Sequence, residues 1–208
     1  MNLQLYQHAG CKIWVWVLTE TDTVESIRAR LGYPVDLDGM KAESRQREIL
    51  GIRLIVQHLY GVNERIGYDS QQRPYLKEHQ DFISIAHSHG ILALAVHHTR
   101  PIGMDLEVFG KKMRRVRSIF LNAHELAWQS PNDDTYTSEH LCWTVKEALY
   151  KLLGSPVYDF PNAISIEPPE NAVGNPSEGE LRAVADGRNY LLHYWIREHY
   201  VLTITNAS

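Results

Sequence analysis

Cysteine is scarce in this chain of 208 residues, in which only Cys11 and Cys142 occur. The two lie far apart and lack the spacing of metal ligands, which argues against a disulfide scaffold and favours a reducing compartment. Cys142 has no recognisable base beside it in the sequence, so we interpret it as a packing residue rather than a nucleophile.

Long apolar runs and an excess of positive charge are also missing. No run approaches the ~20 residues of a membrane helix. The run at residues 13–18 lacks a cleavage pattern, so it indicates a buried strand rather than a signal peptide. The net charge of −4 argues against binding of nucleic acid through bulk electrostatics. We therefore expect a soluble, cytoplasmic monomer with neither nucleic acid nor a membrane as partner.

Apolar residues, by contrast, are plentiful. A hydrophobic content of 44% suffices for a core, so we expect one compact domain or two small fused halves. Three short apolar runs stand out at residues 82–86, 91–97 and 102–108. The segments between them, SHG and HTRP, have turn chemistry, so the pattern predicts a three-stranded antiparallel meander.

Side chains alternate in the third of these runs. Gly103, Asp105 and Glu107 fall on one face of the strand, and the apolar residues between them fall on the other face, toward the core. At a rise of roughly 3.3 Å per residue, the two acids have Cβ atoms about 6.6 Å apart and can converge on one hard cation. We expect Gly103 to leave the space in front of them open. The alternative is an ordinary solvated strand face.

A helix with apolar residues at three-and-four spacing is predicted around residues 141–153. Trp143, Glu147 and Lys151 form a separate stripe, one turn apart, beside its core face. The structural alternative for this stripe is an ion pair between Glu147 and Lys151, worth roughly 0.3 to 0.5 kcal/mol.

Three motifs follow one another: S-I-A-H-S at residues 84–88, I-G-M-D-L-E at 102–107 and W-T-V-K-E-A-L-Y-K at 143–151. Their combination and spacing resemble the 4′-phosphopantetheinyl transferase superfamily, specifically its Sfp-type branch, over about residues 73–154. The resemblance implies an α/β fold of the α+β type. Two similar halves, each an antiparallel sheet packed with helices, would be related by a pseudo-twofold axis. One transferase domain would cover residues 1–208, with halves at about 1–99 and 100–208.

The resemblance also implies an enzyme of the holo-[acyl-carrier-protein] synthase type. Such an enzyme transfers the 4′-phosphopantetheine arm of coenzyme A to a serine of an acyl or peptidyl carrier protein and releases 3′,5′-ADP. It depends on Mg²⁺, and its carrier proteins serve fatty acid, polyketide or nonribosomal peptide biosynthesis. Phosphoryl transfer rests on positioning and on neutralising phosphate charge, which suits a metal ion and cationic donors.

Site residues follow by matching the motifs position by position. By resemblance, Asp105, Glu107 and Glu147 would hold Mg²⁺, and Glu147 is also the candidate base for the serine hydroxyl. His87 and Lys151 would bind phosphate and complete the catalytic set.

Basic residues of the first half would meet coenzyme A. Arg73 stands in Q-R-P where the family usually has Gly-Lys-Pro, so we expect it at the nucleotide end of coenzyme A, where arginine can bind phosphate bidentately. Arg53, in the pattern R-E-I-L-G-I-R, is a second candidate. Gln72 replaces the usual glycine, and Ala86 replaces the serine that usually precedes the histidine of the first motif.

A further basic cluster occurs at residues 111–117. In the family this region borders the carrier-protein surface, and carrier proteins are acidic, so we expect the cluster to steer that partner. The alternative is a solvated loop.

Other functions also fit parts of the sequence. A non-catalytic homologue that binds coenzyme A or a carrier protein is compatible with the departures at Gln72 and Ala86. An unrelated metal-dependent phosphohydrolase would need only the acids. A transition-metal site is suggested by four nearby histidines: His87, His89, His97 and His98. Their spacing, however, lacks a helical H-x-x-x-H arrangement.

The remaining elements are predicted more simply. Expected helices lie at residues 21–31 and 39–60, the second capped by Asp38 and ended by Gly61, and residues 1–12 are expected to be irregular. Asn122 and Glu125 have the spacing of a capping arrangement. After Gly154 ends the long helix, a loop at 168–180 and strands complete a second sheet, the strands lying near residues 162–166, 181–184, 190–196 and 200–205.

Overall fold

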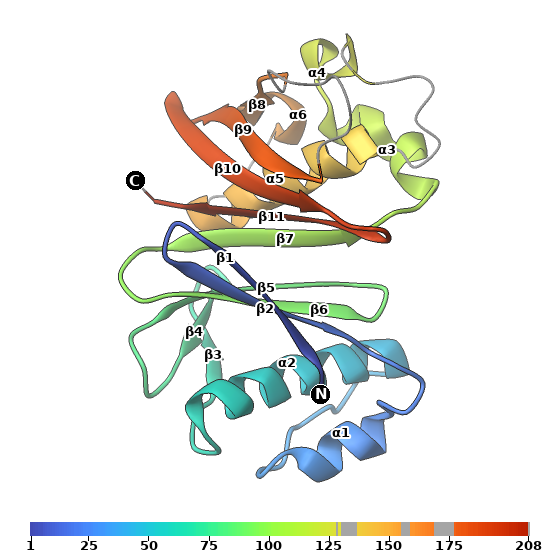
Figure 1. Ribbon diagram of the computed structural model, residues 1–208, viewed down its shortest axis with the longest axis vertical. Coiled ribbons are helices and arrows are strands. Elements are labelled where there is room, and N and C mark those ends of the chain that lie inside the picture. The colour runs from blue at the N-terminus through green and yellow to red at the C-terminus, as the bar shows by residue number, and fades with distance from the viewer. Residues whose placement is uncertain (128, 130–136, 155–158, 169–176, 208) are drawn as a thin grey trace. The chain divides into compact units, whose positions relative to one another are not determined.

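The computed structural model describes residues 1–127, 129, 137–154, 159–168 and 177–207 (Figure 1). The chain divides into two compact units, Met1–Arg100 and Pro101–Ser208. Each unit contains an antiparallel sheet and its own helices, so the predicted α+β class is confirmed. None of the helices within the described residues is both long and apolar enough to cross a membrane.

The first unit packs two helices with a six-stranded sheet. The helices are α1 (Val24–Arg30) and α2 (Glu43–Tyr60). In sheet order, the strands are β1 (Leu3–His8), β2 (Cys11–Val17), β6 (Ile91–His97), β5 (Phe82–Ser88), β4 (Pro74–Leu76) and β3 (Ile66–Tyr68).

Helix α2 covers one face of this sheet because its apolar stripe meets alternate residues of the strands. Leu50 and Ile55 of α2 lie in a buried cluster with Trp16 of β2 and Leu92 of β6. Gly51 allows the close approach, since a Cβ there would lie 2.3 Å from Cδ1 of Leu92. The core of the first unit therefore lies between α2 and the sheet.

Two predictions for the first unit are wrong. Residues 1–12 are not irregular, because β1 pairs with β2 through a tight turn in which Ala9 and Gly10 both have positive φ. Helix α2 begins at Glu43 rather than at residue 39. Asp38, the predicted cap, instead donates its N–H to Oδ1 of Asp36, since Asp side chains compete for local backbone donors.

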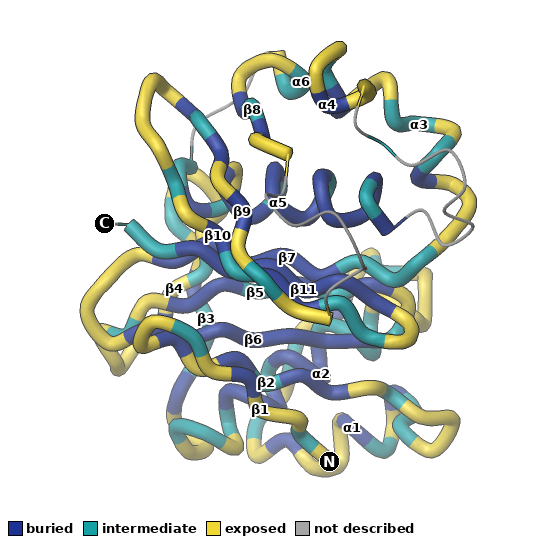
Figure 2. Tube along the Cα trace, turned by 45° about the horizontal axis from the view of Figure 1, so that its top comes forward, coloured by how far each residue is buried: buried dark blue, intermediate teal, exposed yellow. Residues whose placement is uncertain are grey.

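The second unit packs its helices against a second antiparallel sheet. In sheet order, its described strands are β7 (Ile102–Val108), β11 (Tyr200–Asn206), β10 (Arg188–Ile196), β9 (Glu178–Ala185) and β8 (Ile164–Ile166). Its described helices are α3 (Lys112–Phe120), α4 (Ala123–Ala127), α5 (Thr137–Leu153) and α6 (Phe160–Ala163). Helix α5 is largely buried (Figure 2), with Val145 and Leu149 in one cluster with Ala183 of β9 and Leu192 of β10.

The predicted three-stranded meander is only partly correct. Strands β5 and β6 form an antiparallel hairpin, but β7 belongs to the second sheet, where it pairs with β11. Turn residues show where a strand ends and do not identify its partner, which here lies far along the chain. The histidine of β5 and the acids of β7 are therefore in different sheets.

Apart from β1, which has no counterpart among the described residues of the second unit, the two sheets order their strands in the same way. In the first, β2 is followed by α2 and by β3 to β6, and β6 returns to pair with β2. In the second, β7 is followed by α5 and by β8 to β11, and β11 returns to pair with β7. Strands β2 and β7 are thus equivalent, but β2 is apolar and aromatic where β7 carries Asp105 and Glu107.

Candidate active site

Helix α5 approaches β7 at a glycine. A Cβ at Gly103 would stand 1.9 Å from the carbonyl oxygen of Ala148 and 2.9 Å from Cβ of Leu152. The expectation of open space in front of Gly103 is therefore wrong, because the backbone of α5 fills it. The face of β7 that carries Gly103, Asp105 and Glu107 consequently faces this helix.

Polar side chains of α5 meet the buried acid of β7. Nζ of Lys151 donates to Oδ1 of Asp105 at 2.7 Å and to the carbonyl oxygen of Met104 at 3.1 Å. Thr203 of β11, the register partner of Asp105, has its hydroxyl 2.8 Å from that of Thr144 on α5. A row of polar contacts therefore joins α5 to β7 and β11 inside a mostly apolar layer.

Glu147, one turn before Lys151, is half-buried near other acids. Burial raises the pKa of its carboxyl and Asp105 raises it further, against the opposing charge of Lys151, while Glu107 adds a smaller rise; the resulting pKa is about 7. The raised value therefore comes first from burial and then from the negative charge of Asp105.

Three carboxyl groups with excess negative charge are the oxygen donor set that a hard divalent cation such as Mg²⁺ prefers. Asp105, Glu107 and Glu147 therefore fit the metal in their chemistry, although the ligand atoms of the three do not all lie within 4.8 Å of one another in the structure. Lys151 holds one oxygen of Asp105 in the structure, so this ammonium group already neutralises part of the charge that a cation would meet.

Lys146, next to Glu147 in the same motif, has a structural role. Its side chain is fully buried, with Nζ 2.7 Å from Oε2 of Glu125 and 2.8 Å from the carbonyl oxygen of Pro161. Burial lowers its pKa, and the charge and hydrogen bond of Glu125 oppose that shift. Sequence reasoning missed this pair. Helical spacing could have placed Lys146 on the buried face, because it lies four residues after the fully buried Cys142, but it does not identify Glu125 as the partner.

Glu125 also forms the predicted capping arrangement. Its N–H donates to Oδ1 of Asn122 at 2.9 Å, and the N–H of Asn122 donates to Oε2 of Glu125 at 3.0 Å. Oε1 of Glu125 accepts the N–H of Ile166 at 2.9 Å. Through its contacts with Lys146 and with the N–H of Ile166, Glu125 thus connects α4 to α5 and to β8.

His87 lies in the first unit, on the face of β5 that α2 covers. Its ring contacts Arg45 of α2, and its Nδ1 lies 3.2 Å from Oε2 of Glu48. Nη1 of Arg45 is also 3.2 Å from that oxygen. The histidine expected to bind phosphate is therefore accompanied by Arg45, which was not among the residues predicted for the site, and by an acid that contacts both.

Arg73 lies in the β3–β4 hairpin of the first unit and is 49% exposed. Its Nε donates to Oδ2 of Asp69 at 2.8 Å, and its N–H donates to Oδ1 at 2.9 Å. Gln72 has a φ of 62°, in the left-handed region that favours glycine. The loop therefore takes a path suited to the glycine expected from the resemblance, with glutamine in its place.

The structure also places Arg53 on α2 and Ala86 of the first motif on β5. Arg53 is half-buried, and its Nη1 donates to the carbonyl oxygen of Ile49 in its own helix at 3.2 Å. Ala86 is buried on the face of β5 opposite His87, and Ser84 and Ser88 share that face. The structure thus brings together the site residues predicted on β7 and α5, while those predicted at positions 53, 73 and 87 lie in the first unit.

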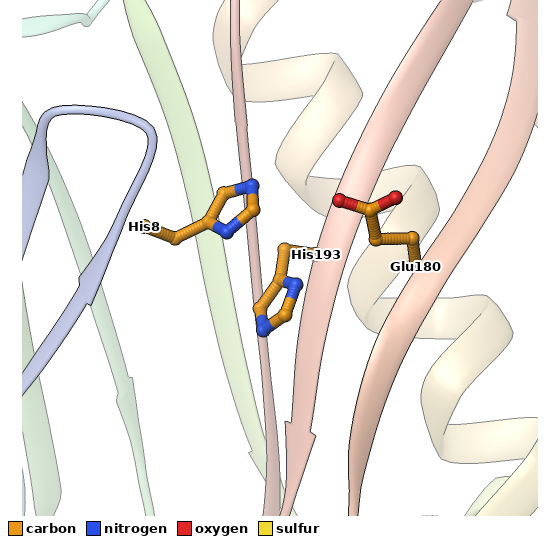
Figure 3. A group of neighbouring side chains, drawn as sticks. All are labelled: His8, Glu180 and His193. Atoms are coloured by element: carbon orange, nitrogen blue, oxygen red, sulfur yellow. The ribbon is translucent and has the colours of Figure 1, made fainter.

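The histidines proposed for a transition-metal site do not form one within the residues that the structure describes. None of the four histidines at positions 87, 89, 97 and 98 joins a group of three metal-capable side chains there. Figure 3 shows His193 of β10 and Glu180 of β9, which are register partners, and also labels His8 at the end of β1 in the first unit. Tyr194 is the register partner of Thr203, and Thr203 is the register partner of Asp105, so these three side chains share one face of the sheet. His193, the residue before Tyr194, therefore lies on the opposite face.

A comparison with protein families connects this geometry to a known group. The family model of the 4′-phosphopantetheinyl transferase superfamily matches residues 101–205, just over half of the chain. The matched segment contains β7 and α5 with the three carboxyl groups and Lys151. No curated protein matches the chain. Because the family model covers the whole strand and helix that build the site, the chain belongs to the 4′-phosphopantetheinyl transferase superfamily.

Proposed function

We propose that this protein is an Sfp-type enzyme that transfers the 4′-phosphopantetheine arm of coenzyme A to a serine of an acyl or peptidyl carrier protein and releases 3′,5′-ADP. One observation carries the proposal. The contact of α5 with β7 gathers Asp105, Glu107, Glu147 and Lys151 inside the segment matched by the family model.

The transfer requires a base and a place for negative charge. The serine Oγ forms a bond to phosphorus, the bond from phosphorus to 3′,5′-ADP breaks, and the proton of the hydroxyl leaves. Glu147 accepts that proton directly or through a water molecule. Lys151 donates a hydrogen bond to a phosphate oxygen. Mg²⁺ held by Asp105, Glu107 and Glu147 would neutralise further phosphate charge.

We assign the binding of coenzyme A to residues of the first unit. His87 and its neighbour Arg45 offer donors for phosphate, and Arg73 offers a planar guanidinium for the nucleotide end. Arg53 is the fourth candidate, although its contact with Ile49 keeps it within its own helix. Glu48 contacts both His87 and Arg45, so an incoming phosphate would have to displace this acid from them.

We assign the docking of the carrier protein to α3, which contains most of the basic cluster. Lys112 and Arg115 are exposed on one face of this helix, together with Ile119, which is 66% exposed. Cations around an exposed apolar side chain are complementary to an acidic partner that also presents apolar surface.

The direct test is mass spectrometry of a purified apo carrier protein incubated with coenzyme A, Mg²⁺ and this protein. A mass gain equal to the phosphopantetheine arm supports the proposal. Binding of coenzyme A or of the carrier protein without any mass gain would instead indicate the non-catalytic homologue. Release of inorganic phosphate with an unmodified carrier protein would indicate a phosphohydrolase.

A further inference from the structure

The first turn of α5 holds a buried acid against α3. Glu139 is fully buried, and its Oε1 lies 3.8 Å from Nε of Arg114 and 3.7 Å from Nη1 of Arg117. Oε2 of Glu139 accepts the hydroxyl of Ser138 at 3.2 Å. A buried carboxylate depends on such cations, because an unpaired charge is costly in the interior. Oε1 of Glu139 is buried without a hydrogen bond among the described residues, so the two arginines balance its charge only through these longer ion-pair contacts.

The next residue of α5 holds the start of α3. Nε2 of His140, a buried side chain, accepts the N–H of Gly110 at 3.0 Å. The carbonyl oxygen of Gly110 in turn accepts the N–H of Met113 in the first turn of α3. The ring of His140 also packs edge-on against Phe109, with centroids 5.2 Å apart. His140 therefore fixes the short connection between β7 and α3.

These contacts divide the basic cluster into two sets. Arg114 and Arg117 are half-buried and turn toward Glu139, whereas Lys112 and Arg115 remain exposed on the outer face of α3. Reversing the charge of Arg114 would place a second carboxylate beside a buried one and disturb the fold. Only the exposed set is suited to a partner.

We propose that Glu139 and His140 are positioning residues that hold α3 where its outer face can receive the carrier protein. His140 lies two turns before Glu147 on α5, so one rigid helix fixes both the candidate base and the docking helix. A misplacement of about 1 Å can cost a large factor in rate when two groups must meet in one geometry. The inference rests on the proposed function, because it takes the carrier protein as the partner of α3.

The His140 variants test the hydrogen bond to Gly110. His140→Leu removes the acceptor, whereas His140→Gln keeps an acceptor at a similar reach. Because a buried donor without a partner is costly, we expect His140→Leu to raise KM for the carrier protein about five- to tenfold. KM for coenzyme A should stay within about twofold, and His140→Gln should restore most of the wild-type value.

Glu139→Gln provides a second arm, which keeps the shape of the side chain and removes its charge. We expect a similar rise in KM for the carrier protein, with faster amide hydrogen exchange across residues 110–120 in this variant and in His140→Leu. Arg115→Glu is the matched control: it should raise the same KM without changing exchange in that segment, because Arg115 lies on the exposed face. If His140→Leu does not fold, Glu139→Gln alone decides the result.

The outcomes separate the inference from the proposed function. Unchanged exchange at residues 110–120 in both variants, or equal kinetic losses with leucine and glutamine at position 140, would overturn the positioning role while wild-type transfer stands. A wild-type protein that leaves the carrier protein unmodified would overturn the proposed function and the inference with it.

Discussion

The carbonyl oxygen of Ala148 lies so close to Gly103 that a Cβ there would stand 1.9 Å from it. Atoms that are not bonded do not approach to this distance, so glycine alone lets α5 rest on β7 in this way. The contact sets the separation between the acids of β7 and the polar residues of α5. The candidate active site therefore depends on a residue that has no side chain.

Replacing this glycine should disturb both the fold and the site. Gly103→Ala would force α5 away from β7, and we expect a loss of about 1–3 kcal/mol in the free energy of unfolding, as for other overpacked sites. Gly110→Ala is the matched control, because its Cβ would meet nothing within 4 Å. Urea unfolding and turnover should both single out Gly103→Ala, and equal stabilities of the two variants would contradict the close approach.

Arg73→Ala should weaken coenzyme A binding more than carrier-protein binding. A charge-assisted contact with phosphate is worth roughly 1.5 to 3 kcal/mol, so we expect KM for coenzyme A to rise about tenfold to over a hundredfold. Lys12→Ala, at an exposed position of β2, serves as the control. An unchanged KM for coenzyme A would show that the hairpin loop that carries Arg73 is only a turn held by Asp69 and does not bind coenzyme A.

Acid should weaken the hairpin that carries Arg73. Glu64 is buried and accepts the N–H groups of Arg65 and Lys77 and a hydrogen bond from the ring of His79. Burial alone would raise the pKa of Glu64, but the bond from His79 and the backbone N–H groups outweigh it, and the pKa is lowered from 4.5.

A carboxyl group with a lowered pKa stabilises the folded state above its unfolded pKa of 4.5, and this contribution is lost as the pH falls below that value. We therefore expect Glu64→Gln to cost about 1–3 kcal/mol near neutral pH and progressively less in acid. Urea unfolding of both proteins at neutral and acidic pH measures the difference. A difference that is the same at every pH would show that the charge of Glu64 contributes nothing.

Removal of divalent metal should abolish transfer, because the carboxyl groups of Asp105, Glu107 and Glu147 repel one another and favour a cation between them. Mg²⁺ should also raise the melting temperature of the wild-type protein, and Asp105→Asn should lose that rise. Asp186→Asn, in the exposed turn after β9, should keep it. Full transfer in excess EDTA would be incompatible with the metal assignment.

Local periodicity explains which parts of the site could be predicted from the sequence. The two-residue repeat of β7 placed Asp105 and Glu107 on one face, and the helical repeat of α5 placed Glu147 beside Lys151. The partners of these elements could not be read in the same way. Pairing of β7 with β11, and of Lys151 with Asp105, depends on contacts between distant segments that leave no local pattern.

The same limit explains the missed residues. Arg45 looks like any other charge on a helix until β5 brings His87 to it. His140 and Glu139 look like ordinary helix residues in the sequence. Only the folded structure shows that His140 contacts Gly110 and that Glu139 lies near Arg114.

The rate at which the Glu147→Gln variant modifies a carrier protein tests the central claim most directly. The substitution keeps the shape of the side chain and removes both a ligand charge and the base. Mass spectrometry over time should show turnover lower by at least about a hundredfold than in the wild type, in the range typical of a lost general base. Glu167→Gln, at an exposed position of the second unit, should transfer at the wild-type rate. Transfer by folded Glu147→Gln at the wild-type rate would contradict the account and leave Glu147 without a role in catalysis.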